Sequence, residues 1–140
     1  MRIRTIAAFA IMRLPMPRTW RPFFARLGGV RAGKRVFIGR GVSFDTMYPS
    51  NIVIEDDVHI TDNCTFLTHC LDTSAGWIVW KEGHIRICRK AFIGTGTIIT
   101  KSCTIGEFSV VGAGSVVTRD IPPGEIWAGN PAVFLKRRNK

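Results

Sequence analysis

The chain contains three histidines, and His69, in the sequence LTHCLD, is the candidate for a proton acceptor. An imidazole changes its charge near pH ~6.5, so it can take a proton from a hydroxyl group at neutral pH. In the six-residue repeat described below, His69 falls at a corner and is expected to face outward. His59 and His84 are interpreted as structural.

Three nearby side chains offer related chemistry. Cys70 could act as a thiol nucleophile, but it falls on an inward position of the repeat, which favours direct assistance by His69 over a covalent intermediate. Asp45 and Asp72 are the carboxylates that could orient His69 or bind hydroxyl groups, and for each of them a plain surface charge is an equal alternative.

Branched aliphatic residues recur at every sixth position, at Ile93, Ile99, Ile105, Val111 and Val117. Small residues follow four positions later, at Thr97, Cys103, Ser109 and Ser115. A hexad is too short for a helical crossover between parallel strands, so each must be a short strand and a corner. This fixed period predicts a stacked solenoid with the aliphatic side chains inside.

The period extends upstream through Ile38, Phe44, Ile54, Ile60, Phe66 and Ile87, with small or short residues at Val42, Val58, Cys64, Cys70 and Ala91. Residues 45–53 interrupt it mildly and residues 71–84 strongly. The second interruption contains Trp77 and Trp80, which favour an ordered protruding loop.

We therefore expect one domain in three parts. Residues 1–29 form a basic, partly helical segment, residues 30–123 form the solenoid with the protruding loop 71–84, and residues 124–140 form a tail. The segment is expected to cover the open end of the solenoid with its apolar side chains, which are Trp20, Pro22, Phe23, Phe24 and Leu27.

The positive charge is concentrated at the N-terminal end. Of 20 Lys and Arg in the chain, 10 lie in residues 1–40, which contain no acid, so the remaining 10 balance all 10 Asp and Glu and leave the net charge of +10 in the first part. This asymmetry favours an anionic partner such as acidic lipid or a lipid-linked phosphosugar. Nucleic acid fits on charge alone, and a solvated basic arm is the plain alternative. In a helix, Arg2 and Arg13 would lie on one side, but Phe9 would lie among them. The pattern expected of an amphipathic helix that binds membranes is therefore imperfect.

The four cysteines form no Cys-x-x-Cys pair, so a zinc site is not expected. Cys64, Cys70 and Cys103 are interpreted as core thiols, and a reducing cytoplasm is the natural setting. No apolar run approaches the ~20 residues of a membrane span.

The residues that precede the inward aliphatics should face outward, because strand side chains alternate. Apolar side chains occupy this column at Phe92, Ile98, Val110 and Val116. Such a column indicates that another subunit covers it in a closed oligomer.

Residues 92–132 (FIGTGTIITKSCTIGEFSVVGAGSVVTRDIPPGEIWAGNPA) and LTHCLD at 67–72 resemble the hexapeptide-repeat acyltransferases, in particular the galactoside and maltose acetyltransferases and bacterial polysaccharide O-acetyltransferases. The resemblance covers roughly residues 36–135. It implies an all-β fold, a left-handed parallel β-helix, assembled as a homotrimer with active sites between subunits. It also implies acetyl-CoA as donor.

The resemblance assigns roles to individual residues. His69 corresponds to the catalytic histidine. Thr95, Ala113, Thr118, Arg119 and Lys136 correspond to residues that bind the donor, with Arg119 in place of a lysine. Val133 departs from the pattern, since some relatives have an arginine there, and Arg137 or Arg138 could supply that phosphate contact. Apart from the resemblance, the carboxylates of Asp45 and Asp72 and the loop residue Trp77 are expected to bind the acceptor, and the cysteine and histidine spacing predicts no metal site.

The expected function is therefore acetyl-CoA-dependent O-acetylation of a sugar hydroxyl, in a cell-surface polysaccharide or a lipid-linked saccharide, by His69 general-base catalysis in a ternary complex. The expected location is the cytoplasm, with peripheral membrane contact through the N-terminal segment as a further hypothesis. Acetylation of an amino sugar, serine or antibiotic is the first alternative. A non-catalytic basic binding module is a remote one, and the balanced charge of residues 41–140 speaks against nucleic acid. A hexapeptide-type carbonic anhydrase needs three zinc-binding histidines with a pair five residues apart, which this spacing does not supply.

Overall fold

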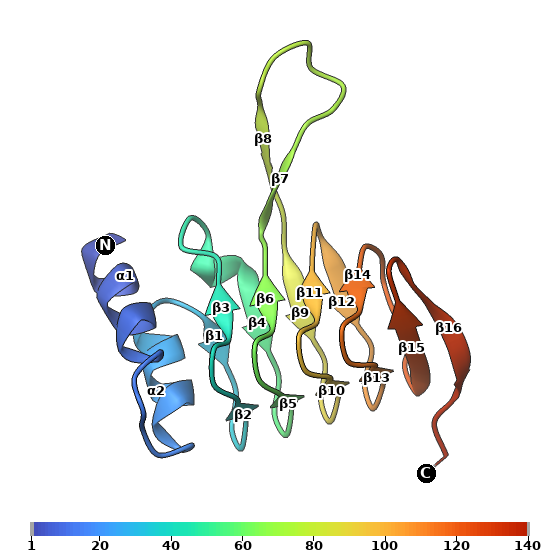
Figure 1. Ribbon diagram of the computed structural model, residues 1–140, viewed down its shortest axis with the longest axis horizontal. Coiled ribbons are helices and arrows are strands. Elements are labelled where there is room, and N and C mark those ends of the chain that lie inside the picture. The colour runs from blue at the N-terminus through green and yellow to red at the C-terminus, as the bar shows by residue number, and fades with distance from the viewer. Residues whose placement is uncertain (1, 140) are drawn as a thin grey trace.

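The computed structural model describes residues 2–139 as short strands stacked in successive coils, with two helices at the N-terminal end and a long hairpin that projects from the stack (Figure 1). Met1 and Lys140, the outermost residues of the expected N-terminal segment and tail, lie outside the described residues. No helix within the described residues is long and apolar enough to cross a membrane.

Three sheets form the sides of the stack. The first contains β1 (Arg31–Ala32), β4 (Ile52–Ile54), β9 (Ile85–Ile87) and β12 (Cys103–Ile105). The second contains β2 (Phe37–Ile38), β5 (His59–Ile60), β10 (Phe92–Ile93), β13 (Val110–Val111), β15 (Glu125–Gly129) and β16 (Ala132–Arg137). The third contains β3 (Ser43–Phe44), β6 (Thr65–Phe66), β11 (Ile98–Ile99) and β14 (Val116–Val117). Strands pair in parallel throughout, except that β16 returns antiparallel to β15.

The predicted hexads fill the interior between these sheets. Ile93 pairs with Val111, three hexads further on, so one coil consists of three hexads and gives one strand to each sheet. Ile93, Ile99 and Ile105 are fully buried, as are the small residues between them. Burying an aliphatic side chain of this size stabilises a fold by about 1.5–3 kcal/mol. The expectation of a common aliphatic interior is confirmed.

Two of the three expected core thiols lie in this interior. Cys64 and Cys103 are buried, and burial raises the pKa of the Cys103 thiol to about 12, which keeps it protonated and unreactive at neutral pH. The expectation for Cys70 is wrong, because it is only partly buried. The chain leaves the coil before residue 70, and the fully buried Thr68 is the last side chain to point inward.

The corner between the second and third sheets depends on glycine in two different ways. Gly96 and Gly114 adopt φ of 72° and 70°, a left-handed conformation that glycine accepts without strain. Gly94 is needed for space, since a Cβ there would lie 2.5 Å from the backbone nitrogen of Ala113 in the next coil. The glycines that directly follow the aliphatic residues, such as Gly94, therefore permit close stacking of coils.

The third corner carries the two interruptions of the repeat. Residues 45–51 include the short 3-10 helix η1 (Pro49–Asn51). In the next coil the chain leaves after Thr68 and forms an antiparallel hairpin of β7 (His69–Leu71) and β8 (Trp80–Glu82) before it rejoins the stack at β9. The predicted protruding loop is thus a hairpin, which extends well beyond the coils (Figure 1).

The expected helical cap is formed by α1 (Arg2–Ile11) and α2 (Trp20–Leu27), which lie at the open end of the first coil (Figure 1). Pro22 is buried and Phe24 packs against the core, as expected. Trp20, Phe23 and Leu27 were expected to cover the core too, and that expectation is wrong because all three are exposed. Residues Ala8, Met12, Ala25 and Val30 fill the cap instead.

The expected outward column is present on the second and third sheets. Phe92 and Ile98 are exposed, and Val110 and Val116 are partly exposed, each beside a buried neighbour in its strand. On the second sheet the His59 ring stacks between Phe37 and Phe92 with centroid separations of 5.2 and 6.4 Å. His59 therefore belongs to a surface aromatic ladder.

Candidate active site

Asp45 and His69 meet at the third corner, although they lie in different coils. Asp45 follows β3 directly and His69 begins β7, where the chain leaves the next coil. The Nδ1 atom of His69 lies 2.5 Å from Oδ2 of Asp45. The side chain of Asp45 is 3% exposed and that of His69 is 24% exposed, so a buried carboxylate supports a partly accessible ring.

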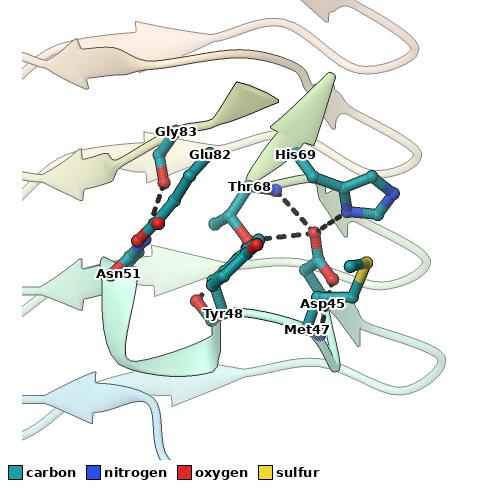
Figure 2. Close-up of polar contacts among 8 residues, drawn as sticks. All are labelled: Asp45, Met47, Tyr48, Asn51, Thr68, His69, Glu82 and Gly83. Carbon is teal, nitrogen blue, oxygen red and sulfur yellow. Dashed lines mark hydrogen bonds and ion pairs between the residues drawn. The ribbon is translucent and has the colours of Figure 1, made fainter. Parts of the chain in front are cut away.

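The Asp45 carboxylate is held by donors on both oxygens (Figure 2). Oδ1 accepts a hydrogen bond of 2.9 Å from the N–H of Met47, and Oδ2 accepts two of 2.9 Å from the N–H and hydroxyl of Thr68. Burial alone would raise the pKa of Asp45, but the hydrogen bonds from Met47, His69 and Thr68 outweigh it and lower the pKa. Asp45 is therefore ionised at neutral pH.

An ionised carboxylate can only accept hydrogen bonds, so Nδ1 of His69 must carry the proton in this contact. The neutral ring then has its lone pair on Nε2, which points away from Asp45 (Figure 2). An acceptor hydroxyl placed at Nε2 could lose its proton to the ring. This is the arrangement of a general base with an orienting carboxylate.

The returning strand of the hairpin closes one side of the histidine. Trp80 contacts the His69 ring edge to face, with 5.1 Å between centroids and an interplanar angle of 81°. Asn51 of η1 fixes this strand, because its side-chain amide donates to the Glu82 carboxylate at 2.6 Å and to the Gly83 carbonyl at 3.1 Å (Figure 2). The hairpin base is thereby tied to the coil that holds Asp45.

The other two expected acceptor-binding residues lie further along the hairpin. Asp72 accepts hydrogen bonds from the hydroxyl and N–H of Ser74 and pairs with Lys81 at 3.1 Å, and these contacts lower its pKa to about 2. The Asp72 carboxylate thus bonds Ser74 and Lys81, and Asp45 is the carboxylate that contacts His69. Trp77 is 80% exposed near the end of the hairpin.

The expected donor-binding residues fall into three groups. Thr95 and Ala113 occupy the second corner in successive coils, where the Gly114 N–H donates to the Thr95 carbonyl at 2.8 Å. Thr118 and Arg119 follow β14 at the third corner, and the Arg119 guanidinium lies 5.2 Å above the Trp127 ring. Lys136 lies in β16 and is exposed. In one chain, therefore, Thr95 and Ala113 lie at a different corner from His69.

Sequence reasoning missed two residues of the site. Thr68 was not singled out, although a threonine directly before the histidine at a coil exit was a usable signal. Trp80 was identified only as a loop residue, since its contact with His69 depends on hairpin register. Cys70 is partly exposed, but it alternates with His69 along β7 and so points to the opposite face.

Within the described residues, no group of three or more His, Cys, Asp and Glu side chains is arranged to hold a metal ion. His59 lies in the aromatic ladder of the second sheet, His69 lies at the base of the hairpin, and His84 is an exposed residue just before β9.

Comparison with known proteins gives consistent similarities, although no family model matches the chain. A candidate acetyltransferase of Staphylococcus aureus strain Mu50 is 38% identical over 121 residues, which cover 69% of this chain and 60% of the relative. The galactoside O-acetyltransferase of Escherichia coli K12 is 34% identical over 116 residues, covering 76% of this chain and 56% of the relative. The chain thus spans little more than half the length of these curated relatives.

The fold is also that of a solved structure. A hexapeptide-repeat acetyltransferase of Vibrio cholerae, solved with acetyl-coenzyme A, superimposes with a TM-score of 0.82 at 24% identity, covering 99% of this chain and 87% of the other. By sequence and by fold, the chain is a relative of the hexapeptide-repeat acetyltransferases.

Proposed function

We propose that the chain is an acetyl-CoA-dependent O-acetyltransferase that modifies a sugar hydroxyl. The observation that carries this proposal is the pair of Asp45 and His69, which leaves Nε2 free as a proton acceptor beside a hairpin. The curated relatives support the reaction class, and one of them is a galactoside O-acetyltransferase. The three parallel sheets agree with the left-handed β-helix expected for this class.

The chemistry follows from this geometry. As the acceptor oxygen attacks the thioester carbonyl carbon, Nε2 of His69 takes its proton, and the Asp45 carboxylate stabilises the resulting imidazolium. The carbon–sulfur bond then breaks, and the proton on His69 can pass to the departing thiolate. Both substrates are present together, so Cys70 forms no acetyl-enzyme.

The residues expected to hold the donor are chemically suited to it. A Cβ added at Gly96 or Gly114 would meet nothing within 4 Å, so open space lies beside the corner that carries Thr95 and Ala113, where an extended pantetheine arm could lie. Arg119 and Lys136 supply positive charge for the phosphates of coenzyme A. The Vibrio relative, solved with acetyl-coenzyme A, supports this donor.

Release of free thiol from acetyl-CoA, measured across a panel of sugar, amine, serine and antibiotic acceptors, tests the proposal. We expect a saccharide to be the best acceptor and His69→Ala to lower kcat by about 10²–10⁴-fold. His84→Ala is the matched control, because His84 is an exposed histidine and its recorded contacts use only backbone atoms. Wild-type turnover in His69→Ala would disprove the assignment of the base, and no thiol release with any acceptor would favour a binding module.

We further propose a homotrimer with the site between subunits, since the apolar outward column needs a cover and Thr95 lies at a different corner from His69. Mixing two inactive variants tests whether the site lies between subunits. Ala113→Trp should block the donor corner and His69→Ala should remove the base, so co-refolded mixtures should regain activity that neither variant has alone. Activity that stays absent in mixtures of confirmed trimers would place both functions in one subunit.

The proposed setting is the cytoplasm, where acetyl-CoA is available, with a cell-surface polysaccharide or its lipid-linked precursor as acceptor. The basic N-terminal segment supports an anionic or membrane-bound acceptor. The same acceptor panel tests this step, if it includes a saccharide with and without a phospholipid anchor.

A further inference from the structure

The first N-terminal helix has two apolar faces, and the fold uses only one. Thr5, Ala8 and Met12 are buried, and Phe9 packs on Phe44 of the first coil with 5.8 Å between ring centroids. Phe9, which weakens the amphipathic pattern in the sequence, therefore belongs to the face that covers the solenoid. The remaining face must be considered separately.

That second face is apolar and exposed. Ile3 is 85% exposed and Leu14 is 58% exposed, and Ile6 and Ile11 are exposed as well. At 3.6 residues per turn, Ile3 and Ile6 fall on the side of α1 opposite Ala8, and Leu14 is exposed in the connection just after the helix. We call the exposed apolar residues of both helices, together with Leu14, the outer stripe. The helix α2 contributes Trp20, Phe23 and Leu27, which are spaced for one helix face.

Arginines border the outer stripe. On α1, Arg2 lies to one side of the exposed apolar residues and Arg4 to the other, and Arg13 and Arg18 follow in the connection to α2. All four are exposed, and residues 1–40 contain no acid. Within residues 2–40, only Arg35 and Arg40 form ion pairs, with Asp57 and Asp62 of the coils.

This combination favours one kind of cover. A second copy would bring the same basic rim against itself, and like charges across an interface are repelled. Nucleic acid would match the charge but would leave the isoleucines and leucines uncovered. An anionic bilayer matches both features, because aliphatic and aromatic side chains enter the headgroup region while arginines bind lipid phosphates.

We propose that the outer stripe and its arginines dock the protein on an anionic lipid surface, with α1 and α2 lying in the plane of the headgroups. A helix of 10 residues lies on the surface and does not span it. The open end of the solenoid would then face the membrane. This inference does not depend on the reaction that the chain catalyses.

Flotation of the full-length protein with vesicles tests the proposal. We expect binding to phosphatidylcholine vesicles that contain phosphatidylglycerol, weak binding to pure phosphatidylcholine, and loss of binding as salt rises. Arg13→Gln and Arg18→Gln should each weaken binding by about fivefold, since an arginine near an anionic surface contributes about 1 kcal/mol. The double variant Ile6→Asn with Leu14→Asn should bind more weakly than either arginine variant, and it should lose binding to both the anionic and the neutral vesicles.

Two controls match these changes elsewhere on the surface. Ile78→Asn removes an exposed isoleucine from the hairpin, and Lys101→Gln removes an exposed charge from a coil corner, so both should bind vesicles as the wild type does. Circular dichroism should show that all variants remain folded. Equal binding to neutral and anionic vesicles, no binding at low salt, or a change of oligomeric state in Ile6→Asn with Leu14→Asn would overturn the proposal, the last in favour of a second copy.

Discussion

The third corner is built in two ways in neighbouring coils. After β11 the chain turns through Thr100, Lys101 and Ser102 and enters β12 at once. One coil earlier, after β6, it turns through Thr68 and leaves for a hairpin before β9 begins. The tight corner only connects two strands, whereas the interrupted corner carries the His69 imidazole and the Trp80 ring and presents the imidazole to the buried Asp45 carboxylate of the preceding coil.

The difference shows how a repetitive scaffold acquires chemistry. The same parallel register holds on both coils, since β6 pairs with β11 and β11 with β14. The register positions Asp45 one coil before His69, so the two side chains can meet across the stack. The departure of the chain at Thr68 gives the histidine room to face solvent.

The largest expected effect comes from replacing the Asp45 carboxylate, which contacts the histidine of the interrupted corner. In Asp45→Asn, the amide can donate to Nδ1 of His69, which moves the lone pair to the wrong nitrogen. We expect kcat to fall by about 10²–10⁴-fold with little change in KM, measured by thiol release. Asp72→Asn is the control on the hairpin, and an equal loss there would contradict the role assigned to Asp45.

The same variant has a signature in acid. The pKa of Asp45 is lower in the folded chain than its unfolded value near ~3.9, because hydrogen bonds outweigh burial. The ionised Asp45 carboxylate therefore stabilises the folded chain fully at pH values above the unfolded pKa. This stabilisation is lost as the pH falls through the folded pKa. Denaturant titrations between pH 7 and pH 2 should show a shallower acid loss for Asp45→Asn than for the wild type, and an unchanged slope would contradict the lowered pKa.

A core substitution at the tight corner should affect stability and not chemistry. Ile99 is fully buried in β11, and Ile99→Ala should lower the free energy of unfolding by about 2–5 kcal/mol through lost burial and a residual cavity. Urea denaturation measures this effect. Turnover per folded molecule should change less than tenfold, and a collapse of kcat at full folding would show that the two corners are coupled.

The smallest expected effect concerns Thr68, the last residue before the chain leaves its coil. Thr68→Val removes the hydroxyl that donates to Asp45 but leaves the N–H donor in place. We expect the free energy of unfolding to fall by about 1.5–3 kcal/mol and kcat to decrease several-fold, because a single hydrogen bond to a charged group is lost. Thr97→Val, at a buried threonine that bonds only backbone carbonyls, is the matched control and should leave kcat unchanged.

The two corners also mark where sequence reasoning succeeds and where it stops. The hexads predict the buried residues well, because every sixth side chain must fill the same interior. They fail at Cys70, since periodicity cannot show at which residue the chain leaves a coil. The choice between Asp45 and Asp72 stays open in the sequence, because the contact with His69 depends on coil stacking. The outer stripe on α1 is also not predictable from the sequence, because a helix with two apolar faces does not show a clear amphipathic pattern.

The strand β16, which runs back antiparallel along β15, has a consequence for how the protein behaves at high concentration. A solenoid offers the next coil at its end a ready template, and end-to-end growth into fibres would need an incoming strand in parallel orientation. The reversed strand covers the edge of β15 instead, and the helices cover the opposite end of the stack. Parallel addition of a further coil is therefore hindered at both ends.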